Sequence, residues 1–140
     1  MQPTLAPGIR HRHTVTVTET MTVPALFRES ETLKAMPPVF ATGFMVGLME
    51  WACLEAMAPH LDDNEGSVGV HVDVSHTAAT PVGMTVTAEV ELESIDGRLA
   101  WFRVVLRDER DIICEGRHQR AVIDKAKFLA KVHQKQRQYT

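Results

Sequence analysis

The chain has 140 residues, of which 44% are hydrophobic and 24% are charged, and its formal net charge at pH 7 is −3. This length is enough to bury a real core in one domain, and the composition is that of an ordinary soluble globular protein. A slightly acidic chain does not favour nucleic acid as the main partner. We therefore expect one domain over residues 1–140, with residues 1–8 flexible and residues 134–140 forming a basic tail.

The sequence also argues against a membrane or secreted protein. No stretch approaches eighteen consecutive apolar residues, and the opening MQPTLAPGIRHRH lacks the apolar core of a signal peptide. The two cysteines, Cys53 and Cys114, do not have a metal-binding spacing and are expected to be buried free thiols. These features predict a cytoplasmic protein without a membrane span.

The first predicted element is a strand over residues 11–23, where threonine and valine alternate. His11 and His13 share one face of this strand, but no third ligand is evident, so no metal site is predicted. Residues 24–41 are irregular and contain three prolines. This segment is expected to form a lid, or a short helix with a turn, before the next element.

A long apolar helix is predicted from Phe40 to Leu61, with Thr42 as its N-cap and Pro59 close to its end. Glu50 stands in the middle of this helix, on a face that is otherwise small or apolar. A carboxylate in that position must find a partner, take up a proton or take part in chemistry. The alternative is a structural Glu50 at a rim of the core or satisfied by backbone donors. Glu55 points about 140° away, as expected of a solvent-facing residue.

After the helix, Asp62 to Gly66 form a predicted turn, and Asp96-Gly97 is typical of a tight hairpin between two strands. Four antiparallel strands are predicted over residues 67–79, 84–94, 98–108 and 111–124. The C-terminal residues are expected to begin as a short amphipathic helix and to fray into the basic tail. The whole pattern predicts an α+β fold, in which a curved sheet wraps the helix and leaves an edge that invites a second copy.

Two rows of this sheet carry polar side chains inward. In the strand at 67–79, a row of four alternating valines is continued by His76, which is therefore expected to point toward Glu50. An inward histidine beside an inward glutamate suits an acid–base pair, although a satisfied core histidine is the alternative. The last strand places His118 and Arg120 inward, where they line a polar cleft or a subunit interface, or where Arg120 pairs with a carboxylate.

Thr42 is either only a helix cap or a hydroxyl offered to a substrate. Eight residues, or about 12 Å along the helix axis, separate Thr42 from Glu50. The two groups cannot grip one carbonyl unless a substrate spans them or a second subunit contributes one of them. The sequence has no phosphate loop, dinucleotide fingerprint or GxSxG elbow. A glutamate, a histidine and a threonine, without metal or cofactor, suit hydrolysis of an activated acyl group.

Four blocks of sequence carry a resemblance to a known family: VFATGFMVGLMEWAC at 39–53, EGSVG at 65–69, HTAATP at 76–81 and RAVI at 120–123. From about residue 9 onward the chain resembles the fluoroacetyl-CoA thioesterases, a branch of the hot-dog fold in which a sheet wraps a long helix. The resemblance implies that Thr42, Glu50 and His76 are catalytic. It also implies that Gly69 and Arg120 line the substrate site.

The resemblance leads us to expect a homodimeric thioesterase that hydrolyses a short acyl-CoA, with fluoroacetyl-CoA as the leading substrate and no metal or cofactor. Leu33, Met36 and Phe40 are expected beside the substrate. Leu33 and Met36 stand where relatives that reject acetyl-CoA have phenylalanines, so looser selection for the fluorinated group is expected. A hot-dog hydratase and a non-catalytic acyl-CoA-binding module are the alternatives.

Overall fold

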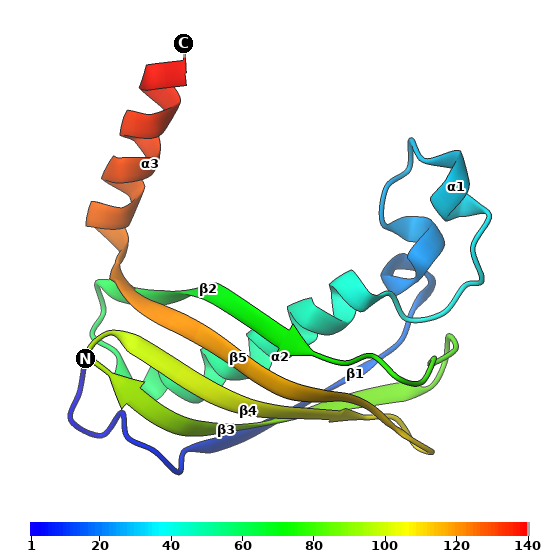
Figure 1. Ribbon diagram of the computed structural model, residues 1–140, viewed down its shortest axis with the longest axis horizontal. Helices are drawn as coiled ribbons and strands as arrows, with labels where there is room; N and C mark the ends of the chain where they lie inside the picture. The colour runs from blue at the N-terminus through cyan, green and yellow to red at the C-terminus, as the bar shows by residue number, and fades with distance from the viewer. Residues whose placement is uncertain (140) are drawn as a thin grey trace.

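The computed structural model describes residues 1–139 as a five-stranded antiparallel sheet that curls around one long helix (Figure 1). The order of the strands across the sheet is β1-β3-β4-β5-β2, so β1 and β2 are its two edges. The strands are β1 (Arg10–Thr16), β2 (Glu65–Val74), β3 (Thr85–Asp96), β4 (Leu99–Arg107) and β5 (Ile112–Asp124). The helices are α1 (Glu31–Lys34), α2 (Thr42–Met57) and α3 (Lys125–Tyr139).

Helix α2 is the centre of the core and packs mainly against β1 and β3. Its apolar residues are distributed around most of its circumference, as expected of a helix that a sheet wraps. The buried side chains of α2 are Met45, Leu48, Met49, Ala52, Cys53, Ala56 and Met57. The predicted long helix is confirmed, and a turn of 3-10 helix at Ala58–His60 follows it.

The predicted N-cap of this helix is wrong. Ala41 has the extended backbone of a capping residue, and Thr42 is the first residue of α2. The Thr42 hydroxyl bonds to a side chain outside the helix instead of to the first turn. The threonine is therefore free for the other role considered for it, which is to offer its hydroxyl to a ligand.

The four strands predicted after the helix are confirmed, although the first of them ends at Val74 and not at residue 79. The strand predicted over residues 11–23 is too long, because β1 ends at Thr16. Two short turns of 3-10 helix follow β1, at Glu19–Met21 and Val23–Ala25. The second turn contains Pro24, which cannot donate to a strand ladder, so no strand continues through it to residue 23.

A bulge in β2 changes which of its residues face the helix. The pairing of β2 with β5 shifts register between Gly69 and His71, so one strand carries an extra residue there. Before the bulge Ser67 faces α2, whereas after it Val72 does. The prediction that four valines share the inner face is therefore wrong for Val68, before the bulge. Val72 is still 44% exposed, because β2 is an edge strand that contacts α2 less than β1 and β3 do.

The two ends of the chain also differ from the sequence-based expectations. Residues 1–8, expected to be flexible, are tied to the body: the amino group of Met1 pairs with Asp62 at 2.9 Å, and Leu5 is buried. At the other end α3 continues to Tyr139, so residues 134–139 of the predicted tail are helical and not frayed, and residue 140 lies outside the described residues. Figure 1 shows α3 projecting away from the sheet. Within residues 1–139, no helix combines the length and the apolar character that crossing a membrane requires.

Candidate active site

Glu50 leaves the inner side of α2 and meets Arg120 of β5. The Nη1 atom of Arg120 donates a hydrogen bond of 2.9 Å to Oε2 of Glu50. The Arg120 side chain is 3% exposed, whereas that of Glu50 is 37% exposed. The pairing of Arg120 with a carboxylate, one of the alternatives considered from the sequence, is therefore confirmed. It fixes the carboxylate from the buried side while leaving it accessible.

Arg120 is itself held by a network of hydrogen bonds. Its Nε donates to the hydroxyl of Ser67 and its Nη2 to the Ser67 carbonyl, both at 2.9 Å. Nη1 also lies 3.1 Å from Nε2 of His118, a fully buried residue. Burial lowers the pKa of His118, so the ring is neutral at pH 7. Its Nδ1–H donates to the carbonyl of His71 at 2.8 Å, which leaves Nε2 to accept from Arg120.

Strand β2 comes close to this network at Gly69. A Cβ atom at that position would lie 3.2 Å from Oε2 of Glu50 and 3.2 Å from Cε1 of His118. These separations are tighter than ordinary van der Waals contact, so glycine leaves the space that Glu50 occupies. The structure thus brings three of the predicted site residues together: Glu50, Gly69 and Arg120.

The supporting roles of Ser67 and His118 were not predicted from the sequence. Alternation along the strand assigns Ser67 to the outer face, because it gives no sign of the bulge that follows. The sequence predicts that His118 faces inward, but its bond to the His71 carbonyl of β2 depends on how the strands pair. The available signal was the inward row on β5, where a histidine and an arginine cannot both be ordinary core residues.

Thr42 and His76 form a second group at the start of α2. The Thr42 hydroxyl and Nδ1 of His76 are 2.8 Å apart. Thr42 is exposed, and His76 lies half-buried in the loop after β2. Burial lowers the pKa of His76, opposed in part by the backbone of Ala78, so the imidazole is neutral at pH 7. Its Nε2 atom is buried and has no hydrogen-bond partner among residues 1–139.

The predicted pairing of His76 with Glu50 is wrong within one chain. His76 pairs with Thr42, and Glu50 pairs with Arg120. Since Thr42 and Glu50 are eight residues apart on α2, the two groups are separated by about 12 Å along the helix axis. Each chain therefore presents two separate groups, which we call half-sites. The hydroxyl half-site is Thr42 with His76, and the carboxylate half-site is Glu50 with Arg120.

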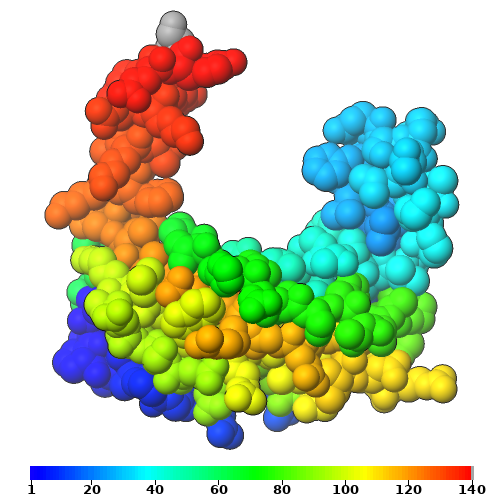
Figure 2. Space-filling model, in the orientation of Figure 1, coloured from blue at the N-terminus to red at the C-terminus, as the bar shows by residue number. Residues whose placement is uncertain are grey.

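The expected lid segment stands apart from the sheet. It contains α1, and Figure 1 shows it rising from the body beyond the start of α2. Phe40, at the end of the segment, is buried in the core, whereas Leu33 is half-buried and Met36 is 42% exposed. Figure 2 shows the molecule hollowed between this segment and α3, with β2 on the floor of the hollow.

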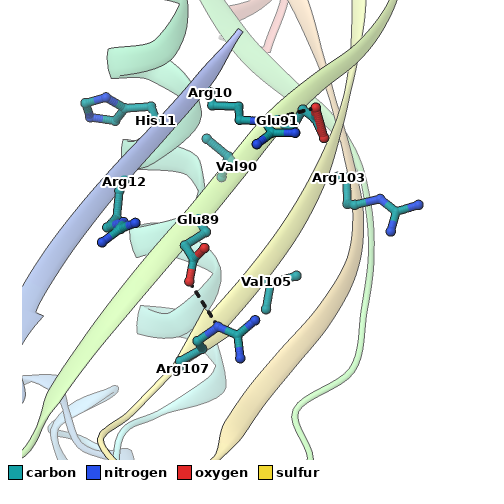
Figure 3. Close-up of a pocket in the computed structure, with 9 residues that line it drawn as sticks. All are labelled: Arg10, His11, Arg12, Glu89, Val90, Glu91, Arg103, Val105 and Arg107. Atoms are coloured by element: carbon teal, nitrogen blue, oxygen red, sulfur yellow. Dashed lines mark hydrogen bonds and ion pairs between the residues drawn. The ribbon is translucent and has the colours of Figure 1, made fainter. Parts of the chain in front are cut away.

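The outer face of the sheet carries a groove of 480 Å³ across β1, β3 and β4 (Figure 3). Four arginines line it, and two of them are paired with neighbouring acids. Arg107 bonds Glu89 at 3.0 Å, and Arg10 bonds Glu91 at 3.2 Å. The groove contains none of the residues of the two half-sites, and we do not assign the chemistry to it.

Comparison with known proteins decides the family. Residues 17–126 match a protein-family model described as fluoroacetyl-CoA-specific thioesterase. The chain belongs to this family. The fluoroacetyl-CoA thioesterase of Streptantibioticus cattleyicolor is 51% identical to it over 135 residues, which cover 96% of this chain and 97% of that protein.

Solved structures of fluoroacetyl-CoA thioesterases share the fold. A threonine variant of the fluoroacetyl-CoA thioesterase FlK in complex with fluoroacetate has a TM-score of 0.91 and 51% identity, covering 94% of this chain and 98% of that one. A second threonine variant of FlK, in complex with acetyl-CoA, has a TM-score of 0.92 with the same identity and coverage. A thioesterase superfamily member from Thermus thermophilus is 30% identical, with a TM-score of 0.88 and coverage of 99% and 98%. The predicted family, hot-dog fold and thioesterase class are confirmed.

Proposed function

We propose that this chain hydrolyses the thioester of a short acyl-CoA, with fluoroacetyl-CoA as its preferred substrate. The observation that carries the proposal is Glu50, a partly exposed carboxylate that buried Arg120 holds on an otherwise apolar side of a helix. The family supports it, because a relative 51% identical to this chain is a fluoroacetyl-CoA thioesterase.

Glu50 acts on the carbonyl carbon of the thioester, either as the base for an attacking water or as the nucleophile itself. In both routes a carbon–oxygen bond forms, the carbon–sulfur bond breaks, and the sulfur leaves with the bonding electrons and takes up a proton. In the second route water then cleaves the acyl–Glu50 anhydride. Arg120 holds the Glu50 carboxylate in one orientation, in which it faces the substrate carbonyl.

Thr42 and His76 serve the other side of the carbonyl group. The Thr42 hydroxyl contacts the acyl group from the first turn of α2, where the positive end of the helix dipole stabilises charge that develops on oxygen. His76, neutral because its pKa is lowered by burial, accepts and returns a proton. The relatives that carry a substituted threonine and bind fluoroacetate or acetyl-CoA support a role for Thr42 near the acyl group.

A second copy of the chain completes this site. Two half-sites about 12 Å apart on one helix can act on a single carbonyl if a substrate spans them or if one of them comes from a partner, and we propose the second arrangement. The uncovered edge strand β2 supports a homodimer, since Val70 and Val72 are 50% and 44% exposed there. An isologous pair is the commonest closed assembly. Light scattering should give twice the chain mass of 15.6 kDa, and an active monomer would contradict the proposal.

Substrate selection falls to the segment before α2. Leu33 and Met36 are flexible aliphatic side chains, and Met in particular adapts to varied contacts. We therefore expect weaker discrimination between fluoroacetyl-CoA and acetyl-CoA than in a relative with phenylalanines at both positions. The ratio of kcat/KM for the two substrates measures this directly.

Release of free thiol from a panel of acyl-CoAs, followed with a colorimetric thiol reagent, tests the function. The protein itself contributes little background, because burial raises the pKa of Cys53 to about 12 and that of Cys114 to about 11. We expect thiol release, with the highest kcat/KM for fluoroacetyl-CoA. Binding of acyl-CoA without thiol release would favour a non-catalytic module, and addition of water to an enoyl-CoA would favour a hydratase.

A further inference from the structure

Three metal-ligating side chains meet on the surface between β1 and α2, away from both half-sites. Nε2 of His11 lies 2.6 Å from Oε2 of Glu55, and Nδ1 of His13 lies 3.3 Å from the same oxygen. The ligand atoms of all three residues lie within 4.8 Å of one another. The side chains are 34%, 22% and 38% exposed in the order His11, His13, Glu55, so an ion in solvent can reach them.

The fold creates this cluster from two distant segments. Alternation along β1 places His11 and His13 on the side that faces α2, while Arg10 and Arg12 point to the outer groove (Figure 3). Helix α2 supplies the third ligand, Glu55, which the sequence alone suggests is an ordinary solvent-facing acid. The ligand that the two histidines lack in the sequence is therefore present in the structure.

We propose that His11, His13 and Glu55 bind one divalent first-row transition metal ion, with Zn²⁺ as the leading candidate. Two imidazoles and a carboxylate are ligands that Zn²⁺ accepts, with water completing a tetrahedron. Ligands about 2.05 Å from a tetrahedral Zn²⁺ are roughly 3.3 Å apart. The His13–Glu55 separation of 3.3 Å already has this value, and His11 needs only to exchange its hydrogen bond to Glu55 for the metal.

Trp51 prepares the carboxylate for this role. Its Nε1 donates to Oε1 of Glu55 at 2.9 Å, which leaves Oε2 facing the two histidines. Its ring also lies against that of His13, with the centroids 4.0 Å apart. A contact that orients a metal ligand in this way raises the affinity of the site.

The consequence is a clamp between an edge strand and the central helix. A metal ion held by β1 and α2 stabilises their packing, because an ion that binds the folded chain and not the unfolded chain shifts the equilibrium toward the fold. Glu55 does not contact the Glu50–Arg120 network, and β1 is the edge of the sheet opposite β2. The ion therefore has a structural role, and its binding does not depend on the proposed acyl-CoA hydrolysis.

Calorimetric titration of EDTA-stripped protein with Zn²⁺ tests the site. We expect one Zn²⁺ per chain, and a Tm that rises by several degrees with Zn²⁺ and falls back with EDTA. His13→Ala and Glu55→Gln should each weaken Zn²⁺ binding by at least about tenfold. His133→Ala, at an exposed histidine of α3, is the matched control and should bind Zn²⁺ like the wild type.

A fluorescence reporter locates the ion independently. The chain has two tryptophans, so Trp101→Phe leaves Trp51 as the only one. Cu²⁺ should quench Trp51 saturably in this background, and adding Glu55→Gln should weaken that quenching by about tenfold. Circular dichroism identifies any variant that fails to fold, and His11→Gln then replaces it. The proposal is overturned by wild-type protein that binds no Zn²⁺ saturably, or by His13→Ala and Glu55→Gln proteins that bind it as tightly as the wild type.

Discussion

The two half-sites on α2 are built in contrasting ways. The carboxylate half-site around Glu50 is supported by a buried arginine, which is in turn held by Ser67 and His118. The hydroxyl half-site consists of one hydrogen bond between exposed Thr42 and half-buried His76, whose Nε2 has no partner among residues 1–139. The carboxylate half-site is therefore held by several hydrogen bonds within one chain, whereas the Thr42 hydroxyl is held by one.

This contrast indicates how the work is divided. A carboxylate that must attack or activate water benefits from a fixed orientation, and the fold provides it with buried hydrogen bonds. The exposed hydroxyl of Thr42 can reach a substrate, and His76 holds it through Nδ1. The carboxylate half-site should therefore matter for both stability and rate, and the hydroxyl half-site mainly for rate.

The largest expected effect is on the rate, from Glu50→Gln. The variant keeps the shape and a hydrogen-bond acceptor for Arg120 but cannot act as a base or nucleophile. We expect kcat/KM for fluoroacetyl-CoA to fall by at least about 100-fold. Near-normal thiol release by a correctly folded variant would return Glu50 to a purely structural role.

Arg120→Gln should lower the stability of the protein more than a substitution in the hydroxyl half-site does. It leaves Glu50, Ser67 and His118 without their shared donor. Loss of one partner of a buried pair is strongly destabilising, and because Glu50 is partly exposed we expect the free energy of unfolding to fall by about 2–3 kcal/mol. Urea unfolding measures it, with Thr42→Ala as the matched control at about 0.5 kcal/mol or less. Equal losses in both variants would contradict the contrast.

Substitution at the hydroxyl half-site should distinguish substrates. Fluorine makes the neighbouring C–H bond easier to deprotonate, and the imidazole of His76 is a suitable base for that proton. His76→Ala should lower kcat/KM for fluoroacetyl-CoA more than for acetyl-CoA. Deuterium at the α-carbon should slow fluoroacetyl-CoA hydrolysis and leave acetyl-CoA hydrolysis almost unchanged. If deuteration changes neither rate and His76→Ala lowers both equally, His76 serves only the carbonyl group.

Much of the fold could be predicted from the sequence, because it rests on local periodicity. The apolar helix, the four later strands and the inward row on β5 follow from spacing alone. The bulge after Gly69 could not be predicted, since it depends on how β2 pairs with β5. The partner of Glu50, Arg120, is 70 residues away on β5. Without the arrangement of the strands, the sequence does not show which inward side chain contacts Glu50. Thr42 has the residue type of a helix cap, but Ala41 occupies the cap position and the Thr42 hydroxyl bonds to His76.

The pH dependence of stability should be a smaller effect. Burial lowers the pKa of His118 in the folded chain below the ordinary imidazole value of about 6.5. The unfolded chain then binds the proton more readily, so stability is fully present above about pH 6.5 and decreases as the pH falls below it. This histidine contributes a slope of at most about 1.4 kcal/mol per pH unit. His118→Gln should reduce the slope measured by urea unfolding between pH 7 and pH 5, and an unchanged slope would assign the effect to other groups.

The central claim is that each active site combines Thr42 and His76 of one chain with Glu50 of another. Chains carrying Thr42→Ala and chains carrying Glu50→Gln are each expected to be nearly inactive alone. After the two are unfolded together and refolded in equal amounts, half of the dimers are mixed, and each mixed dimer has one intact site of its two. We predict recovery of about one quarter of the wild-type rate of fluoroacetyl-CoA hydrolysis. A mixture that stays as inactive as its two components would show that each site belongs to a single chain.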